Sequence, residues 1–412
     1  MRDTSKTDAG RSDESPVSWD AAARIAARLA RPGSTAPRAE LDALVAGLRE
    51  AADQAAGHVA ELTRLSPADG AAARPTRVVV VDRANWARAN VGMLRAMTDS
   101  ALPHGSGSLA LLTRGVSAAQ IGAVLAALAS RVLGQFDPFA TPGPSRAVPG
   151  ALPAPTPDAA PARPPEAAPA PKPEAAPARP GQLLLVAPNV LRMERELGAD
   201  PEQFRLWVCL HEQTHAAQFA TAPWLAEHVR GGAQGLIESL SADMSGRLAG
   251  SAALRDLADG VLRAITEQRR RPERGRPPDL EAAAAGSPLI GAVLNAEQRR
   301  MFVELSAVMS LLEGHADVTM DAVGPDVLPG VRTIRAAFEN RRDGRGAGDR
   351  VLRRLLGLDL KLAQYRDGAA FVRAVQAKVG LDGFNAAWTE PAHLPTPAEI
   401  SDPGAWVRRI HG

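Results

Sequence analysis

The chain has 412 residues, enough for one large domain or two ordinary ones, and its 45% hydrophobic content is that of a globular protein. Its 48 basic and 46 acidic side chains leave a formal net charge of +2, which excludes a general electrostatic attraction to nucleic acid. The single cysteine, Cys209, excludes an internal disulfide and a zinc site built from several cysteines.

The same features bear on location. The polar N-terminal residues lack the apolar core of a signal peptide, and the longest uncharged stretch, residues 115–130, is too short to span a membrane. Cysteine usage this low is typical of a reducing compartment. We therefore expect a cytoplasmic protein that binds neither membranes nor nucleic acid.

The first third of the chain predicts a helical region. Residues 1–15 are polar and predicted to be disordered, and residues 16–140 follow as the first structured region. Apolar residues recur at helical spacing in three segments, residues 19–29, 41–62 and 117–133. Four consecutive valines in RVVVVDRANW, residues 77–86, predict a short buried strand that leads into a helix ending near Met97.

An Ala/Pro-rich stretch separates this region from the rest. Residues 141–180 cannot bury enough apolar surface to fold, and we expect an extended, disordered segment. The run GQLLLVAPNV, residues 181–190, predicts a second buried strand. Because the pieces on either side could meet in space, we interpret residues 141–180 as an insertion within one fold, with a second structured region over residues 181–412.

A helix with a distinctive motif comes next. Asp200 is a good N-cap, Pro201 suits the first helical position, and Gln203 would complete an arrangement like a capping box. Apolar residues and two histidines then recur three and four positions apart, and Pro223 predicts the end of the helix near residues 221–223. The histidines are therefore expected to face the protein interior.

The motif is H-E-x-x-H, formed by His211, Glu212 and His215. Residues four apart lie one helical turn above each other, so both imidazoles can bind one metal ion. Glu212 would then lie beside that metal, where a carboxylate can take a proton from a metal-bound water. The motif predicts a zinc hydrolase, because a site with a purely structural metal has no need of a base at this position.

A catalytic zinc ion usually has three protein ligands, so a third must come from elsewhere. The extended pattern with a glycine and a third histidine is excluded, because Gln218 and Thr221 occupy those positions. A long helix capped by Asn295 offers Glu313, with Asp317 one turn later to hold a ligand histidine. We favour this glutamate as the third ligand.

Two histidines compete with Glu313. His315 lies about 200° around the helix from Glu313, so only one of the two can point at a given ion. His228 is a weaker alternative. Glu313 and Asp317 could instead be a pair of helix carboxylates that answer nearby arginines.

Several segments together resemble an uncharacterised zincin-like hydrolase family of actinobacteria that is associated with biosynthesis of the deazaflavin redox coenzyme. The matching segments are VVVVDRANW, LLLVAPNV, LHEQTHAAQF with the following PWL, LLEGHADVTMDAVG, KLAQYRDGAAFV and LPTPAEISDPGAWVRR. They extend over most of residues 16–411, whereas residues 141–180 have no recognised counterpart. The family is similar to zinc peptidases with a glutamate ligand.

The resemblance implies a zincin-like catalytic region in residues 181–412, with the ligand set favoured above. The fold class we predict is mainly α with a small β-sheet, formed in part by residues 78–81 and 183–186. The expected function is cleavage of a peptide or amide substrate, with Tyr365, or His315 if its helix is locally turned, as the donor to the oxyanion. The alternatives are a catalytically silent zincin-like protein that binds a partner, and an amidase acting on a cofactor precursor.

Overall fold

The computed structural model describes most of the chain, namely residue 15, residues 17–68, residue 70, and residues 77–102, 108–140, 181–248, 294–343 and 358–412. The disorder predicted for the N-terminus and for residues 141–180 falls almost wholly outside these residues. The described part is mostly helical with one small sheet, as the sequence predicts. None of its helices carries an apolar run long enough to cross a bilayer.

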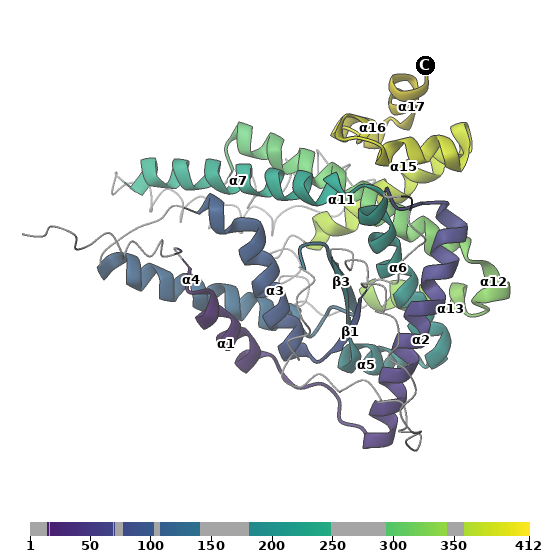
Figure 1. The fold of residues 1–412 in the computed structure, drawn as a ribbon, viewed down its shortest axis with the longest axis horizontal. Coiled ribbons are helices and arrows are strands. Elements are labelled where there is room, and N and C mark those ends of the chain that lie inside the picture. The colour runs from purple at the N-terminus through teal and green to yellow at the C-terminus, as the bar shows by residue number, and fades with distance from the viewer. Residues whose placement is uncertain are drawn as a thin grey trace, which may run out of the picture.

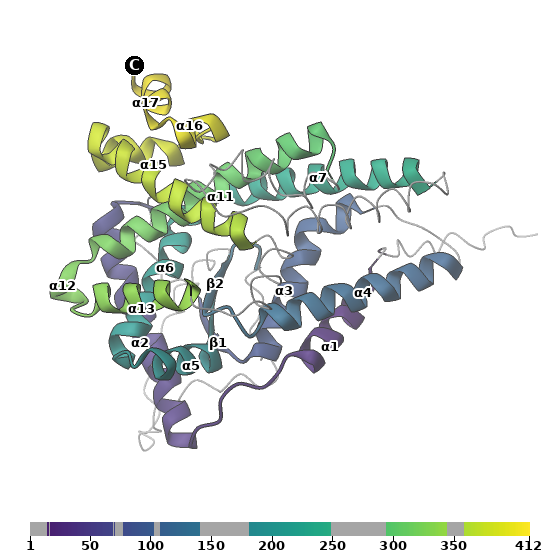
Figure 2. The same ribbon diagram turned by 180° about the vertical axis from the view of Figure 1, so that it is seen from behind.

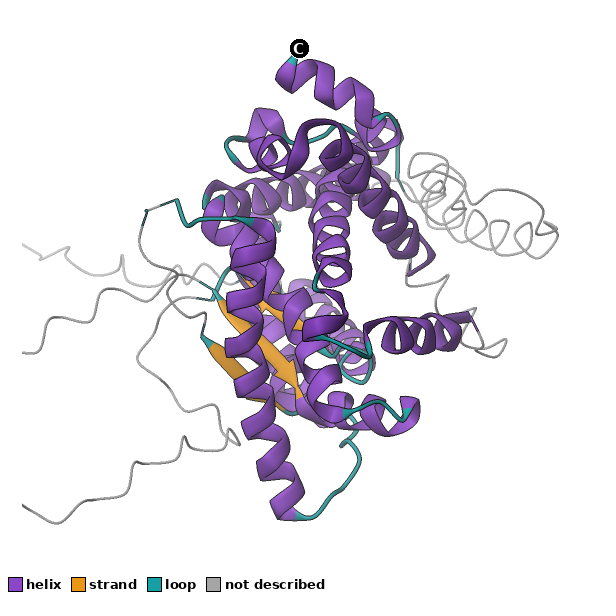
Figure 3. Cartoon of the chain, turned by 90° about the vertical axis from the view of Figure 1, so that its right-hand side faces the viewer, coloured by secondary structure: helices purple, strands orange, loops and turns teal. Residues whose placement is uncertain are grey.

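The sheet has the strand order β1-β3-β2, with β3 (Gln182–Val186) in the centre. Strand β1 (Val78–Val81) runs parallel to β3, and β2 (Gly134–Asp137) runs antiparallel to it. Figure 3 shows this small sheet in orange among the helices. The Gly181 amide donates to the Ala140 carbonyl at 2.9 Å, so the two ends of residues 141–180 meet. Both predicted structured regions contribute strands to one sheet. The insertion of residues 141–180 and its boundaries stay predictions.

Side chains of β3 alternate between two cores, as the twofold period of a strand requires. Leu183 and Leu185 belong to the core formed with α2 (Arg38–Thr63), α5 (Ala187–Leu197) and α6 (Pro201–Thr221). Leu184 and Val186 belong to the core formed with α1 (Trp19–Leu29), α3 (Arg83–Thr98) and α4 (Ser108–Leu128). The sheet therefore lies between two groups of helices (Figure 1).

A third, all-helical core lies beyond the end of α6. It is built mainly from α11 (Ala296–Ala322) and α15 (Leu358–Phe384), with α7 (Trp224–Leu248) beside α11 (Figure 2). The remaining elements are η1 (Asp99–Ala101), α12 (Gly324–Val327), α13 (Val331–Asp343), η2 (Asn385–Trp388), η3 (Pro391–His393), α16 (Pro397–Ser401) and α17 (Pro403–His411). Because α11 contacts α6, α7 and α15, it joins this core to the sheet.

Some local predictions were wrong. Strand β2 was not expected, because GQFD has one apolar residue and its pairing with β3 is non-local. The second strand, by contrast, covers the predicted residues 183–186 and ends at Val186, and α5 follows with Pro188 in its first turn. The helix predicted over residues 117–133 begins earlier, at Ser108, and ends at Leu128.

Candidate metal centre

Helix α6 begins and ends where its sequence predicts. The Asp200 side chain accepts a hydrogen bond from the Gln203 amide at 2.9 Å, Pro201 is the first residue, and the helix ends at Thr221. The capping box is the one incorrect detail. The Gln203 side chain accepts from the Gly330 amide at 2.5 Å, which ties α6 to the segment before α13.

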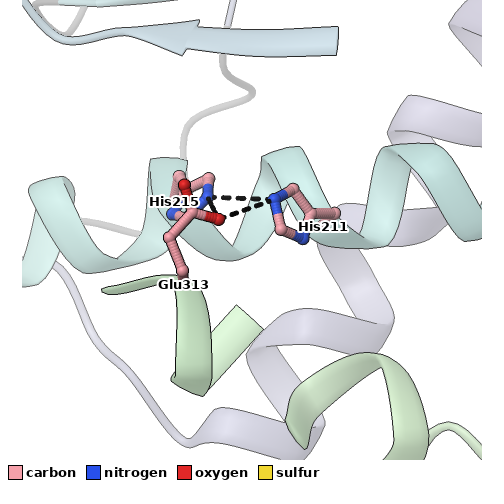
Figure 4. Close-up of side chains that lie close together, drawn as sticks. All are labelled: His211, His215 and Glu313. Atoms are coloured by element: carbon pink, nitrogen blue, oxygen red, sulfur yellow. Dashed lines mark hydrogen bonds and ion pairs between the residues drawn. The ribbon is translucent and has the colours of Figure 1, made fainter. Parts of the chain in front are cut away.

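Most of α6 is buried, and its faces have different partners. Cys209 is fully buried near the Leu48 carbonyl, 3.8 Å away, and Gln213 donates to the Ala52 carbonyl at 2.9 Å, so this face packs on α2. The two histidines of the motif point to α11. Figure 4 shows their rings one turn apart, with the Glu313 carboxylate between them and α11.

Three side-chain atoms converge at this point. The Nε2 atoms of His211 and His215 are 3.3 Å apart. Oε2 of Glu313 lies 3.3 Å from Nε2 of His211 and 3.7 Å from Nε2 of His215. Among the described residues, these three form a group that could hold a metal ion.

The spacing of the three atoms can be compared with a known coordination geometry. In a tetrahedral zinc site with bonds of about 2.0–2.1 Å, neighbouring ligand atoms are roughly 3.3–3.4 Å apart. The three observed distances are close to this value. Two imidazoles and one carboxylate with a fourth position left open are also a common ligand set of catalytic zinc, so the residues present fit the metal.

Glu212, the residue after His211, is 7% exposed and lies next to β2. A Cβ atom built on Gly134, the first residue of β2, would lie 2.7 Å from its Cγ and 2.9 Å from its Oε1. Further along, the rings of Phe136 and Phe219 are 5.6 Å apart, so β2 runs beside the second half of α6. Only glycine at position 134 leaves the Glu212 carboxylate its present place.

The carboxylates also act on the histidines. Burial lowers the pKa of His215, but the hydrogen bond and the charge of Glu313 outweigh it, and the pKa is raised above its ordinary value. The negative charge of Glu212 adds to this effect. In the absence of a metal, the site therefore favours a positive charge between its carboxylates.

The alternative ligands are placed elsewhere. His315 is 1% exposed, and its ring centroid lies 5.1 Å from that of Phe384 and 5.4 Å from that of Trp388. Burial lowers its pKa to about 3, with a smaller contribution from His215, so the ring is neutral. His228 packs edge-on against Trp224. Neither histidine belongs to the group of three ligand atoms found among the described residues.

Asp317 is in contact with two arginines. Arg335 pairs with it, and Nη2 of Arg373 lies 3.7 Å away. The same arginines bind Asp321 one turn further along α11. Burial raises the pKa of Asp317, while Arg335, Arg373 and the more distant His211 partly oppose the shift. Its role in holding a ligand histidine stays a prediction, as does that of Tyr365, whose side chain lies outside the described residues.

Sequence reasoning missed a residue behind His215. Oε1 of Gln218 lies 2.9 Å from Nδ1 of His215, and the Gln218 side chain is fully buried. A polar residue three positions after a ligand histidine, on the same helical face, was the available signal. In the sequence alone, Gln218 serves only to exclude the extended motif.

The fold and this group of side chains define the class of protein. A buried H-E-x-x-H helix faces a glutamate from a second helix, which is the arrangement of a metal-dependent hydrolase. Residues 17–407 match the family of zincin-like metallopeptidases, and the chain belongs to that family. Family membership implies a metal, typically zinc.

The chain was also compared with solved structures and with curated proteins. The chain is similar to a protein from Chloroflexus aurantiacus whose crystal structure is described as that of a "putative hydrolase with a novel fold". The two share 25% sequence identity and a TM-score of 0.55, and the alignment covers 96% of this chain and 98% of the other. A search of curated proteins found no match.

Proposed function

We propose that the protein is a zinc-dependent metallohydrolase that cleaves peptide or related amide bonds. The observation that carries this proposal is the convergence of Nε2 of His211, Nε2 of His215 and Oε2 of Glu313 within 3.3–3.7 Å of one another. These three residues would hold the metal. When bound, zinc supplies a Lewis acid that polarises a carbonyl and lowers the pKa of a water molecule.

The remaining chemistry belongs to the chain. Glu212 takes the proton of the attacking water on its carboxylate and returns it to the leaving nitrogen. Its burial beside Gly134 holds the carboxylate in one place, and this reduces the reorganisation needed during the reaction. Tyr365 is the proposed donor to the oxyanion.

The position of β2 favours an extended substrate. This strand pairs with β3 on one side and is the edge of the sheet in the described part of the chain. Its first residue touches Glu212. An extended peptide can add to such an edge through main-chain hydrogen bonds, which would bring a scissile bond to the base.

The likeness to a family linked with a deazaflavin coenzyme adds a second group of substrates to screen, namely cofactor precursors with amide bonds. The alternative is a catalytically silent protein that keeps the metal for structure or binds a partner. The hydrolase and the silent protein would share the same metal site, but only the hydrolase requires Glu212 as a base.

The proposal is tested by metal analysis and hydrolysis of a peptide library. We expect about one zinc per chain in wild-type protein, loss of zinc in His211→Ala and Glu313→Ala, and zinc with no hydrolysis in Glu212→Gln. Wild-type protein that takes up no zinc when it is supplied would contradict the proposal. Zinc in both wild type and Glu212→Gln, with equal activity, would contradict the role of the base.

A further inference from the structure

Gln218 connects the two helices that carry the metal-site residues. Its side chain extends from α6, and its Nε2 atom donates to the main-chain carbonyl of Leu312 on α11 at 3.0 Å. Leu312 is the residue before Glu313. The same Nε2 atom lies 3.1 Å from Nδ1 of His315, and Oε1 lies 2.9 Å from Nδ1 of His215.

The direction of each hydrogen bond follows from what each atom can do. A main-chain carbonyl only accepts, so the amide nitrogen of Gln218 must face Leu312 and its oxygen must face His215. An amide oxygen also only accepts, so Nδ1 of His215 must carry the hydrogen. In the neutral ring, Nε2 of His215 then keeps its lone pair, and this is the atom that faces His211 and Glu313.

His315 completes the arrangement. Both hydrogens of an amide group can be donated, and Leu312 takes only one. The second is directed at Nδ1 of His315, which must therefore be an acceptor in a neutral ring. The aromatic rings of Phe384 and Trp388 pack against this imidazole and hold it in place.

We infer that Gln218 is a positioning residue that fixes the tautomer and the ring orientation of His215, and that His315 acts through Gln218 instead of binding the metal. This inference rests on the proposed zinc site. Partners behind a ligand histidine typically change metal affinity by about 10–100-fold when they are removed. Because the same amide also binds the Leu312 carbonyl, one side chain links His215 on α6 to the residue before Glu313 on α11.

The test compares zinc affinity in two variants of α6, measured by competition with a chelator. Gln218→Met keeps the length of the side chain but removes the acceptor for His215, and we expect about 10–100-fold weaker binding. Gln213→Met is the matched control, since Gln213 is also a buried glutamine of α6 but donates to Ala52 on α2. We expect the control to bind zinc within about threefold of wild type, a change too small for the loss of a ligand-positioning partner.

A second pair of variants tests whether an acceptor for His215 is what position 218 must supply, and whether His315 binds the metal. In Gln218→Glu, a protonated carboxyl group can still donate to Leu312 and accept from His215, so we expect most of the affinity to return. In His315→Phe, the Leu312 hydrogen bond remains, and we expect a loss of about tenfold or less. A loss of zinc in His315→Phe as large as in His211→Ala would make His315 a ligand and overturn the inference.

A third measurement needs neither a variant of Gln218 nor bound zinc. Nitrogen NMR of histidine-labelled, zinc-free wild-type protein reports which ring nitrogen carries the hydrogen, once the pH has been raised until the His215 and His315 rings are both neutral by their own titration. We expect Nδ1–H in His215 and Nε2–H in His315. The opposite tautomer in either ring, or Gln218→Met with wild-type zinc affinity, would overturn the inference. Wild-type protein that binds no zinc would instead remove the proposed function.

Discussion

Glu313 and Asp317 lie one turn apart on the same helix, yet their surroundings differ in kind. The Glu313 carboxylate faces two imidazoles, whereas the Asp317 carboxylate faces the guanidinium groups of Arg335 and Arg373. Guanidinium is always charged, so Asp317 is already neutralised by protein groups. Imidazoles have lone pairs to offer as well as protons, so the group around Glu313 can exchange its proton for a metal ion.

The role of a carboxylate on this buried helix therefore depends on its partners and not on its spacing. The interpretation that both acids form ion pairs with arginines agrees with the contacts of Asp317 but not with those of Glu313. The interpretation that both acids serve the metal agrees with the position of Glu313. For Asp317, a role in holding a ligand histidine stays a prediction.

The largest effect is expected on zinc affinity when each of these two acids is replaced by its amide. Glu313→Gln should weaken zinc binding by more than about 100-fold, because it removes a charged ligand. Asp317→Asn should weaken it by about tenfold or less, because Asp317 can act only through a ligand. Isothermal titration of zinc into both variants measures the two losses. Equal losses, or a larger loss in Asp317→Asn, would show that the two acids do not have separate roles.

His315 lies on α11 between these two acids in a third, apolar environment, and this predicts a pH effect on the metal-free protein. Its pKa is about 3 in the folded state, below an unfolded value of about 6.5. Below about pH 6.5 the unfolded chain therefore binds the proton and the folded chain does not, so stability falls as the pH falls.

Between about pH 6.5 and pH 5 this group should cost about 2 kcal/mol of unfolding free energy. His315→Phe removes the titrating group but keeps a ring between Phe384 and Trp388. Urea unfolding at both pH values should show a smaller drop for the variant than for wild type. Parallel drops in the two proteins would mean that His315 titrates normally.

Gly134 allows a finer test, because it lies next to Glu212. The three atoms that a Cβ atom at this position would meet, at 2.7–3.0 Å, all belong to the Glu212 side chain, and none of them is a proposed metal ligand. We expect Gly134→Ala to keep its zinc and to lose about tenfold or more in kcat on any substrate found, since a small misplacement of a catalytic group is costly. Gly57→Ala, where no atom lies within 4 Å, is the control. Full activity in Gly134→Ala would separate Glu212 from catalysis.

The smallest expected effect concerns the arginines. Arg335→Met leaves Asp317 and Asp321 as neighbours of like charge on α11, and a loss of about 1 kcal/mol is expected because the pair is partly exposed. Arg332→Met, at an exposed position of α13, should change stability by less than about 0.5 kcal/mol. Thermal unfolding measures both, and equal stabilities of the two variants would contradict the prediction.

The elements that carry the site were predictable because their signals are local. Asp200 and Pro201 set the start of α6, and Asn295 with Gln298 forms the capping box that starts α11. The place of His211 and His215 on one helical face follows from their spacing alone.

What could not be predicted depends on contacts between distant segments. Strand β2 forms only because β3 is there to pair with it, and the importance of Gly134 depends on that pairing. The partners of Asp317 come from 18 and 56 residues further along the chain, at Arg335 and Arg373. The proposed role of Gln218 depends on its hydrogen bond to the Leu312 carbonyl, 94 residues away in the sequence. No local pattern records such contacts.

A crystal of zinc-loaded protein measured on both sides of the zinc absorption edge would locate the metal itself. We predict a single anomalous peak within about 2.0–2.2 Å of Nε2 of His211, Nε2 of His215 and one carboxylate oxygen of Glu313. A peak bound to His315 or His228 in place of Glu313 would contradict the ligand set. A peak remote from all three residues would contradict the metal centre as a whole.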